Sequence, residues 1–428
     1  MWLDVWMQDW VQLLVRWIHM IFGIAWIGAS FYFVWLDNHL VAPGKDKEGK
    51  GLAGELWAIH GGGFYEVAKY KLAPPRMPDH LHWFKWEAYS TWLSGMAMLA
   101  LVYYLGAQAY LIDPRVASLS VTEAVAIGLT SLIVGFICYE GLLRSPLRRN
   151  GAWFGVVLFA LLTLFAWGLF QVFSPRGAYI HVGALIGTIM AGNVFLGIMP
   201  AQRALVKAVE QGKAPDPRYG AMAKLRSTHN NYLTLPILFI MISNHYPFTY
   251  NHAQGWLVLA ALGAISAFAR HFFNLRHKGI VRPWILVVSF IALAAVAYWV
   301  SGRPATMATP VAVSAASASI TDKASADKSA AVAEQAVEPV QNSAGGALTD
   351  DQAMALVQAR CESCHATQPT DPLFAAPPAG IVFTQLADIV SRKAQITTAI
   401  STQYMPLANR TGMTAEERQA LLAWLAAK

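Results

Sequence analysis

Long apolar segments alternate with polar loops over the first 300 residues of the chain. The apolar segments lie at residues 11–36, 89–111, 121–143, 152–173, 179–200, 231–248, 254–273 and 283–300. Each has about 18–25 residues, the length that an α-helix needs to cross a hydrocarbon core roughly 30 Å thick. Because backbone groups in lipid must be hydrogen bonded within the structure, we expect helices and not strands. The pattern therefore predicts an all-α fold, a polytopic membrane helix bundle with about eight transmembrane helices.

The pattern changes after residue 301. Residues 302–346 are rich in Ala, Ser, Pro, Thr and Val and show no helical periodicity. This composition cannot bury enough apolar surface to offset its ordering entropy, so it predicts a flexible linker. Helix signals return in residues 347–428, where one helix is expected to begin near Thr349 and a capping box at Thr414 opens the last one. We therefore predict three parts: a transmembrane domain (1–301), a linker and a small helical domain.

Composition supports a membrane protein. Of the 428 residues, 56% are hydrophobic and 13% are charged, and the mean hydropathy is +0.39. A soluble globular chain has about 45–50% apolar and about 25% charged residues, so a wholly soluble enzyme is excluded. The net charge of +7 resides in the apolar part, since residues 1–301 hold 23 Lys and Arg against 14 Asp and Glu, whereas residues 302–428 hold 9 against 11. This distribution indicates membrane topology and no nucleic-acid partner.

The basic residues of the membrane part are concentrated in every second loop. Loops 37–88, 144–151, 201–230 and 274–282 are rich in Lys and Arg, whereas the alternate loops hold only Arg115 and Arg176. The positive-inside rule places the basic loops in the cytoplasm. Both termini are therefore predicted to lie outside the cytoplasm.

The C-terminal part contains the motif Cys361-Glu-Ser-Cys364-His365. In Cys-x-x-Cys-His sequences the two thiols bond covalently to haem, and the imidazole is the proximal iron ligand. The alternative is a zinc site, which would need four ligands. Residues 347–428 contain no second Cys/His pair, so the motif favours haem over zinc. The second axial ligand is expected to be Met405, which lies in a loop before a proline, whereas Met413 is expected to pack under the last helix. The motif predicts a class I cytochrome c domain with covalent haem c, whose attachment outside the cytoplasm agrees with the loop charges.

Histidines inside the apolar segments suggest a second cofactor. Ionisable residues at bilayer depth are costly and usually mark a pathway or a cofactor. His19 lies in the first span, His181 in the fifth span and His245 in the sixth. All three are expected near the same side of the membrane. One hypothesis is a haem b ligated by His19 with His245 or His181, with Arg16 near a propionate. The alternative is that these histidines cap helix ends or form hydrogen bonds between helices.

Several unusual strings identify a resemblance to a family. They are Arg16-Trp-Ile-His19-Met-Ile-Phe-Gly-Ile-Ala-Trp-Ile-Gly28, His60-Gly-Gly-Gly-Phe-Tyr65, His82-Trp-Phe-Lys-Trp-Glu87, Asn193-Val-Phe-Leu-Gly-Ile-Met-Pro-Ala-Gln202 and His229-Asn-Asn-Tyr-Leu-Thr-Leu-Pro236. Over its whole length the chain resembles the bacterial membrane-bound urate oxidases with a fused cytochrome c. The resemblance implies oxidation of urate to 5-hydroxyisourate in purine catabolism, with electrons leaving through haem. It also implies the bacterial inner membrane, a periplasmic cytochrome c domain, and a periplasmic cytochrome c or terminal oxidase as electron acceptor.

Candidate substrate residues gather on the predicted cytoplasmic side. They are His60, Phe64, Tyr65, His82, Glu87, His229, Asn230, Asn231, Thr234 and His271. Paired Asn amides can read the N–H and C=O groups of a purine dione, and Phe64, Tyr65 or Trp83 can stack on its flat face. His60, His229 and Glu87 are the candidates for the general base. The alternatives are that both Asn residues are helix caps and that His60 with three glycines forms a plain turn.

Two other functions remain open from the sequence. One is a transporter or channel with a redox tail, because polar groups inside spans also suit that class. The other is an electron-transfer subunit that has no urate chemistry of its own.

Overall fold

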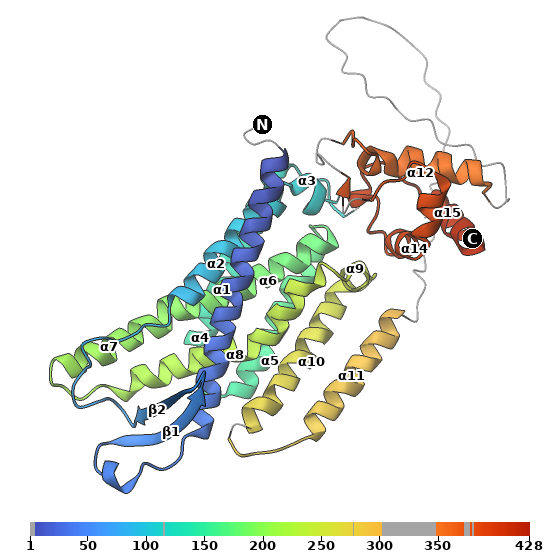
Figure 1. The fold of residues 1–428 in the computed structure, drawn as a ribbon. Helices are drawn as coiled ribbons and strands as arrows, with labels where there is room; N and C mark the ends of the chain where they lie inside the picture. Colours follow the sequence, from blue (N-terminus) through green and yellow to red (C-terminus); the bar gives the residue numbers. More distant parts are fainter. Residues whose placement is uncertain (1–4, 114–115, 277, 302–347, 372–376, 379–380) are drawn as a thin grey trace, which may run out of the picture. The chain divides into compact units, whose positions relative to one another are not determined.

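The computed structural model of the chain describes residues 5–113, 116–276, 278–301, 348–371, 377–378 and 381–428 (Figure 1). The chain divides into two compact units, residues 1–302 and 303–428. The predicted linker, residues 302–346, lies outside the described residues.

The first unit consists of helices that lie side by side, with one β-hairpin (Figure 1). Its α-helices are α1 (Val5–His39), α2 (Trp86–Met98), α3 (Ala107–Tyr110), α4 (Val121–Arg144), α5 (Gly151–Phe170), α6 (Pro175–Gly192), α7 (Met199–Glu210), α8 (Pro217–Ser243), α9 (Pro247–Tyr250), α10 (Gly255–Arg276) and α11 (Trp284–Ser301). Two π-helical segments continue α2 and α6, namely η2 (Leu99–Tyr104) and η4 (Asn193–Ile198).

Within the described residues, six helical segments are long and apolar enough to cross a membrane. They are Trp10–His39, Val121–Arg144, Gly151–Phe170, Pro175–Glu210, Gly255–Arg276 and Trp284–Ser301. The predicted spans 89–111 and 231–248 are largely helical but do not meet this criterion. The first is divided among α2, η2 and α3, and the second is the end of α8, a 27-residue helix whose first half is polar. The structure is thus compatible with a membrane protein, and the prediction of eight spans is not confirmed.

The all-α prediction is wrong for the first long loop. Strands β1 (Leu52–His60) and β2 (Gly63–Tyr70) pair there as an antiparallel hairpin. Gly61 and Gly62 form its turn with φ angles of 58° and 82°. Positive φ at both central positions is the requirement of a type I′ turn, the tight connection that suits twisted strands. The turn therefore accounts for two of the three consecutive glycines.

Helix α6 is the most enclosed of the long helices, because small residues let its neighbours approach. A Cβ on Gly183 would lie 2.6 Å from the Ile240 side chain of α8, and a Cβ on Gly135 of α4 would lie 2.6 Å from Leu185 of α6. Glycine at such contacts lets helices in a membrane pack closely. This packing brings polar residues of α4, α6 and α8 together in the interior.

The second unit is a small helical domain. It contains α12 (Asp350–His365), α13 (Leu386–Ser391), α14 (Lys393–Ser401), η6 (Leu407–Asn409) and α15 (Ala415–Ala427). The predicted helix start near Thr349 and the predicted capping box at Thr414 are confirmed, and Thr349 forms a capping box as well. Met413 is 3% exposed and belongs to the apolar core formed by α12, α14 and α15, as predicted.

A buried ion pair joins α12 to α15, and its loss should destabilise the second unit. Arg360 donates from Nε and Nη2 to the Glu417 carboxylate, the Nη2–Oε1 distance being 2.8 Å. Glu417→Gln keeps the capping box, which accepts Gln at this position, but it leaves Arg360 without its counter-ion. Breaking a buried pair costs about 3–5 kcal/mol. We expect the free energy of opening of α12 and α15 to fall by this amount, as measured by hydrogen exchange of their peptides in the intact protein.

The control for this prediction is Glu416→Gln, one residue away in the same helical turn and exposed to solvent. A surface change of this kind alters the free energy of unfolding by less than about 0.5 kcal/mol. Equal exchange in both variants would contradict a stabilising role for the pair.

Candidate functional site

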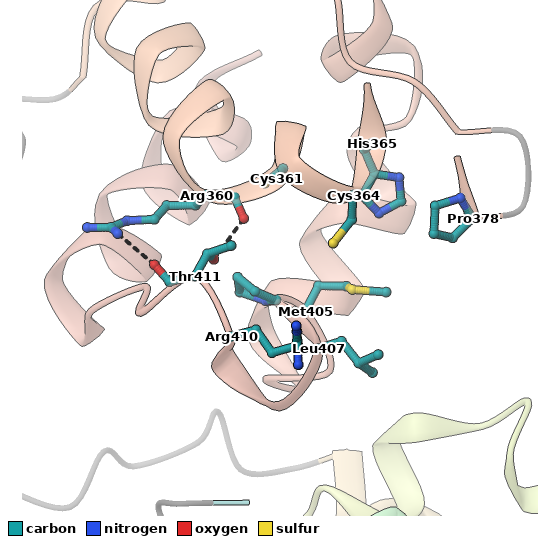
Figure 2. Close-up of a pocket in the computed structure, with 10 residues that line it drawn as sticks. Arg360, Cys361, Cys364, His365, Pro378, Met405, Leu407, Arg410 and Thr411 are labelled. Atoms are coloured by element: carbon teal, nitrogen blue, oxygen red, sulfur yellow. Dashed lines mark hydrogen bonds between the residues drawn. The ribbon is translucent and has the colours of Figure 1, made fainter. Parts of the chain in front are cut away.

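The Cys-x-x-Cys-His motif lines a cavity in the second unit. The cavity is lined by Arg360, Cys361, Cys364, His365, Pro378, Met405, Pro406, Leu407, Arg410 and Thr411. Figure 2 shows the Cys364 thiol, the His365 imidazole and the Met405 thioether around the same space. The helix end thus presents both cysteines and the histidine at one cavity.

One ring nitrogen of His365 is fixed by the backbone. His365 Nδ1–H donates to the carbonyl oxygen of Ile381 at 2.9 Å, which leaves Nε2 as the nitrogen with a free lone pair. Histidines that bind metals typically donate their other ring N–H to a carbonyl or a carboxylate. The imidazole is therefore held in the tautomer that an iron ligand requires.

The loop that carries Met405 is anchored by a buried arginine. Arg418 Nη1 donates to the carbonyl oxygen of Met405 at 2.5 Å, and Nη2 donates to Asn409 Oδ1 at 3.1 Å. Arg418 comes from α15, so the last helix anchors the loop at the Met405 backbone and at the Asn409 side chain. Of the two methionines considered from the sequence, Met405 lines the cavity and Met413 does not.

Neither thiol of the motif has the lowered pKa of a redox dithiol. Both are free in the structure. Burial raises the pKa of Cys361 to about 12 and also raises the pKa of Cys364. A redox dithiol instead uses a lowered thiol pKa. Among the described residues no group of three or more His, Cys, Asp or Glu side chains is arranged to hold a metal ion. The donor set of two thiols, one oriented imidazole and one thioether fits a covalently bound haem.

A hydrogen-bonded network lies inside the first unit; we call it the α8 network. Its members are Tyr139 and Glu140 of α4, Asn193 of η4, and Arg226, His229 and Asn230 of α8. The Tyr139 hydroxyl lies 2.9 Å from His229 Nδ1, and it lies 3.0 Å from Oδ1 and 2.8 Å from Nδ2 of Asn193. Asn193 Nδ2 also donates to Asn230 Oδ1 at 2.9 Å. The Tyr139 hydroxyl can therefore act as donor or acceptor toward His229.

A neutralised arginine anchors this network. Arg226 donates to both oxygens of Glu140, at 2.5 and 3.0 Å, and to Asn193 Oδ1 at 2.9 Å. The close packing depends on Gly197, where a Cβ would lie 2.1 Å from Arg226 Cδ. The His229 ring stacks on Phe154 of α5, with centroids 4.3 Å apart and an interplanar angle of 13°. The ring plane of His229 is thus fixed from one side.

Asn231, which follows Asn230 in α8, belongs to a different group of side chains. Asn231 Oδ1 accepts from Arg270 Nε of α10 at 3.0 Å, and the Arg270 guanidinium lies 4.1 Å from the Phe31 ring centroid of α1. Consecutive helical residues point about 100° apart, which separates Asn231 from Asn230. Thr234 bonds back to the Asn230 carbonyl on its own helix. Asn230 and Asn231 are therefore engaged side chains inside α8, not caps, and they do not form one amide pair.

The hairpin carries the predicted aromatic residues outside the helix bundle (Figure 1). His60 pairs with Gly63 beside the turn and is exposed, and Phe64 and Tyr65 are 78% and 53% exposed. Glu87 lies in the first turn of α2, and its Oε2 is buried without a hydrogen-bond partner among the described residues. His82 Nε2 lies 3.9 Å from Glu87 Oε1. The residues predicted to form one substrate site thus occupy the hairpin, the start of α2 and the middle of α8.

The three histidines predicted as haem b ligands have separate surroundings. His19 Nδ1 lies 3.0 Å from the Thr91 carbonyl oxygen of α2, and the ring packs against Gly95. His181 is fully buried; its Nδ1 donates to its own helix and its Nε2 lies 3.3 Å from the Tyr104 hydroxyl. Gly95 and Tyr104 are nine residues apart on α2 and η2, about 13 Å along a helix axis. His245 follows α8 and is exposed, as is Arg16 on α1.

The haem b hypothesis stays a prediction with His19 as the ligand to test. His19 has its Nδ1 bound to a carbonyl, the arrangement usual for metal-binding histidine. Gln retains a hydrogen bond to Thr91 but does not ligate haem, so His19→Gln should lose all b-type absorbance in a pyridine haemochrome assay. His39→Gln, an exposed histidine at the end of the same helix, is the control. Wild-type protein with covalent haem alone would show that the hypothesis is wrong.

Sequence reasoning overlooked several residues that the structure brings into these groups. Tyr139, Glu140, Arg226 and Arg270 were not among the predicted site residues. The signal that would have found two of them was present, because Glu140 and Arg270 are charged residues inside predicted spans, where charge is costly.

Comparison with known families gives a match for the first unit. The family described as urate oxidase N-terminal matches residues 5–301. The chain belongs to the urate oxidase N-terminal family. The match covers every helix described in the first unit, including α8 and α10, and relates the chain to oxidoreductases that act on urate. It confirms the resemblance for this part of the sequence and does not extend to the second unit. Comparisons with curated proteins and with solved structures gave no match.

Proposed function

We propose that the chain is a membrane-bound oxidoreductase that converts urate to 5-hydroxyisourate and passes the electrons to a haem c in its second unit. From there the electrons would reach a periplasmic cytochrome c or a terminal oxidase. The observation that carries the proposal is the combination, in one chain, of a urate oxidase family unit and a cavity lined by an oriented Cys-x-x-Cys-His motif and a methionine. A subunit that only transfers electrons has no need of the urate oxidase unit.

The reaction requires water and a base. Urate and water give 5-hydroxyisourate, two protons and two electrons, and a bound haem c accepts one electron at a time. Cys361 and Cys364 would attach the haem, and His365 and Met405 would ligate its iron. The residues of the first unit must then bind the flat substrate and remove its proton.

Within the bundle, His229 is the best placed of the three candidate bases. When the Tyr139 hydroxyl donates to Asn193 Oδ1, it accepts from His229 Nδ1–H. His229 Nε2 then has a free lone pair that can take a proton from the substrate, and the hydrogen bond from Nδ1–H to the Tyr139 hydroxyl oxygen holds the resulting imidazolium in place. Glu87, with its unpartnered Oε2, is the second candidate. His60 is exposed on the hairpin, where water competes for its hydrogen bonds.

The proposal is tested by adding urate to the purified full-length protein under anaerobic conditions. We expect the haem c absorption to change to that of the reduced form, with two equivalents of haem reduced for each urate consumed and 5-hydroxyisourate detected by mass spectrometry. Haem that stays oxidised with urate but is reduced by dithionite would contradict urate oxidation. It would favour a transporter or an electron-transfer subunit.

A further inference from the structure

The first unit contains two buried arginines in very different electrostatic situations. Arg226 is 8% exposed and forms a two-pronged ion pair with Glu140. Arg270 is 6% exposed, and among the described residues no carboxylate pairs with it. Its Nη2 is also buried without a hydrogen-bond partner in the described part of the chain. Leaving a buried charge without its partner costs about 3–5 kcal/mol in proteins, so an uncompensated arginine needs an explanation.

Arg270 lies inside an apolar helix, where a charge is costly. It belongs to α10, one of the six helices long enough to span a membrane, and is six residues before the helix end. At 1.5 Å per residue this is about 9 Å from the end of the helix. Charged residues at such positions usually serve a substrate, an ion or a proton path.

The guanidinium of Arg270 is held in place on two sides. Asn231 accepts from Nε, and the Phe31 ring of α1 lies against the guanidinium face at 4.1 Å. These contacts fix the plane of the group and leave the Nη2 edge unused. A fixed planar fork of this kind matches an anion that offers acceptor atoms in one plane.

We propose that Arg270 is the anion-binding residue of the substrate site, and that its Nη2 edge binds the planar urate monoanion between α1, α8 and α10. This inference rests on the proposed function and specifies its substrate site. Urate carries a delocalised negative charge on adjacent ring nitrogen and oxygen atoms, which are acceptors in the plane of the ring. Binding it supplies both the missing counter-ion and the missing hydrogen bond. Asn231 is then a positioning residue that orients Arg270.

Binding is measured without turnover on the full-length protein. Dithionite-reduced, anaerobic protein cannot accept electrons from urate, so equilibrium dialysis with radiolabelled urate reports affinity alone. Arg270→Gln should weaken binding about 30-fold or more, because removing one partner of a buried charged contact costs at least about 2 kcal/mol. The affinity of Arg270→Lys for urate should lie between those of Arg270→Gln and the wild type, because lysine keeps the positive charge but lacks the planar set of N–H donors. Arg276→Gln, at the exposed end of the same helix, should leave the affinity unchanged.

Asn231→Asp separates ligand binding from a structural role. The carboxylate can keep the bond to Arg270 Nε and also supply the missing counter-ion. We expect this variant to be more stable to heat and to bind urate more weakly, because the charge that attracts the substrate is neutralised. A purely structural arginine predicts a more stable protein with unchanged affinity. Asn231→Asp also tests the assignment of Arg270 if Arg270→Gln fails to fold.

The outcomes distinguish the inference from the function on which it rests. Wild-type affinity for urate in Arg270→Gln or in Asn231→Asp would overturn the assignment of Arg270 and leave urate oxidation intact. Wild-type protein that binds no urate would overturn the proposed function and the inference with it.

Discussion

Replacing Cys361 and Cys364 together with Ala is expected to remove all covalent haem and to abolish reduction of external acceptors by urate. The thioether bonds are the only covalent attachment that the motif provides. The first unit should still insert and fold, because the chain divides at residue 302 and the cysteines lie in the second unit. Haem staining of denaturing gels and steady-state reduction of an added cytochrome c measure the two effects.

Cys138→Ala is the matched control for the double variant. Cys138 is exposed on α4 and lines no part of the cavity. Its replacement should leave haem content and activity at wild-type levels. If the double variant still reduced an external acceptor with urate at the wild-type rate, electrons would leave the protein by another route, and the role assigned to the second unit would be wrong.

Met405→Leu should leave haem attached but lower its reduction potential. Thioether ligation raises the potential, and axial ligands set haem potentials over a range of roughly 0.8 V. We expect a fall by a substantial part of that range and loss of the optical signature of methionine ligation. Leu is similar in volume to Met, so the cost in stability should stay below about 1.5 kcal/mol.

Met413→Leu makes the same chemical change in the core of the second unit. It should alter neither the potential nor the ligation signature. The reverse result, with Met413→Leu lowering the potential and Met405→Leu silent, would show that the cavity-lining methionine is not the ligand.

The sequence was sufficient for features that depend on neighbouring residues in the chain. The long apolar segments predict helices because the requirement for internal hydrogen bonds acts within each segment. Thr414 predicts a helix start because a capping box closes over three residues. The haem site stays a prediction, and the Cys-x-x-Cys-His motif permits it because the chemistry of attachment resides in five consecutive positions.

Features that depend on distant partners were not predictable in the same way. The sequence does not predict the hairpin at residues 52–70, because the three glycines after His60 indicate either a close approach to substrate or a plain turn and do not show that the flanking residues pair as strands. The spans predicted at 89–111 and 231–248 are not confirmed. The first is divided among α2, η2 and α3, and the second continues the polar first half of α8. Periodicity does not locate such breaks.

The candidate substrate site shows the same division most clearly. The sequence determined that Asn230 and Asn231 are adjacent and polar, and that Arg226 and Arg270 occur near apolar spans. Only the tertiary structure decided that Asn230 joins Asn193 while Asn231 holds Arg270, and that Glu140 neutralises one arginine and not the other. The physical reason is that a helix directs consecutive side chains about 100° apart, so their partners are set by which helices pack on each side.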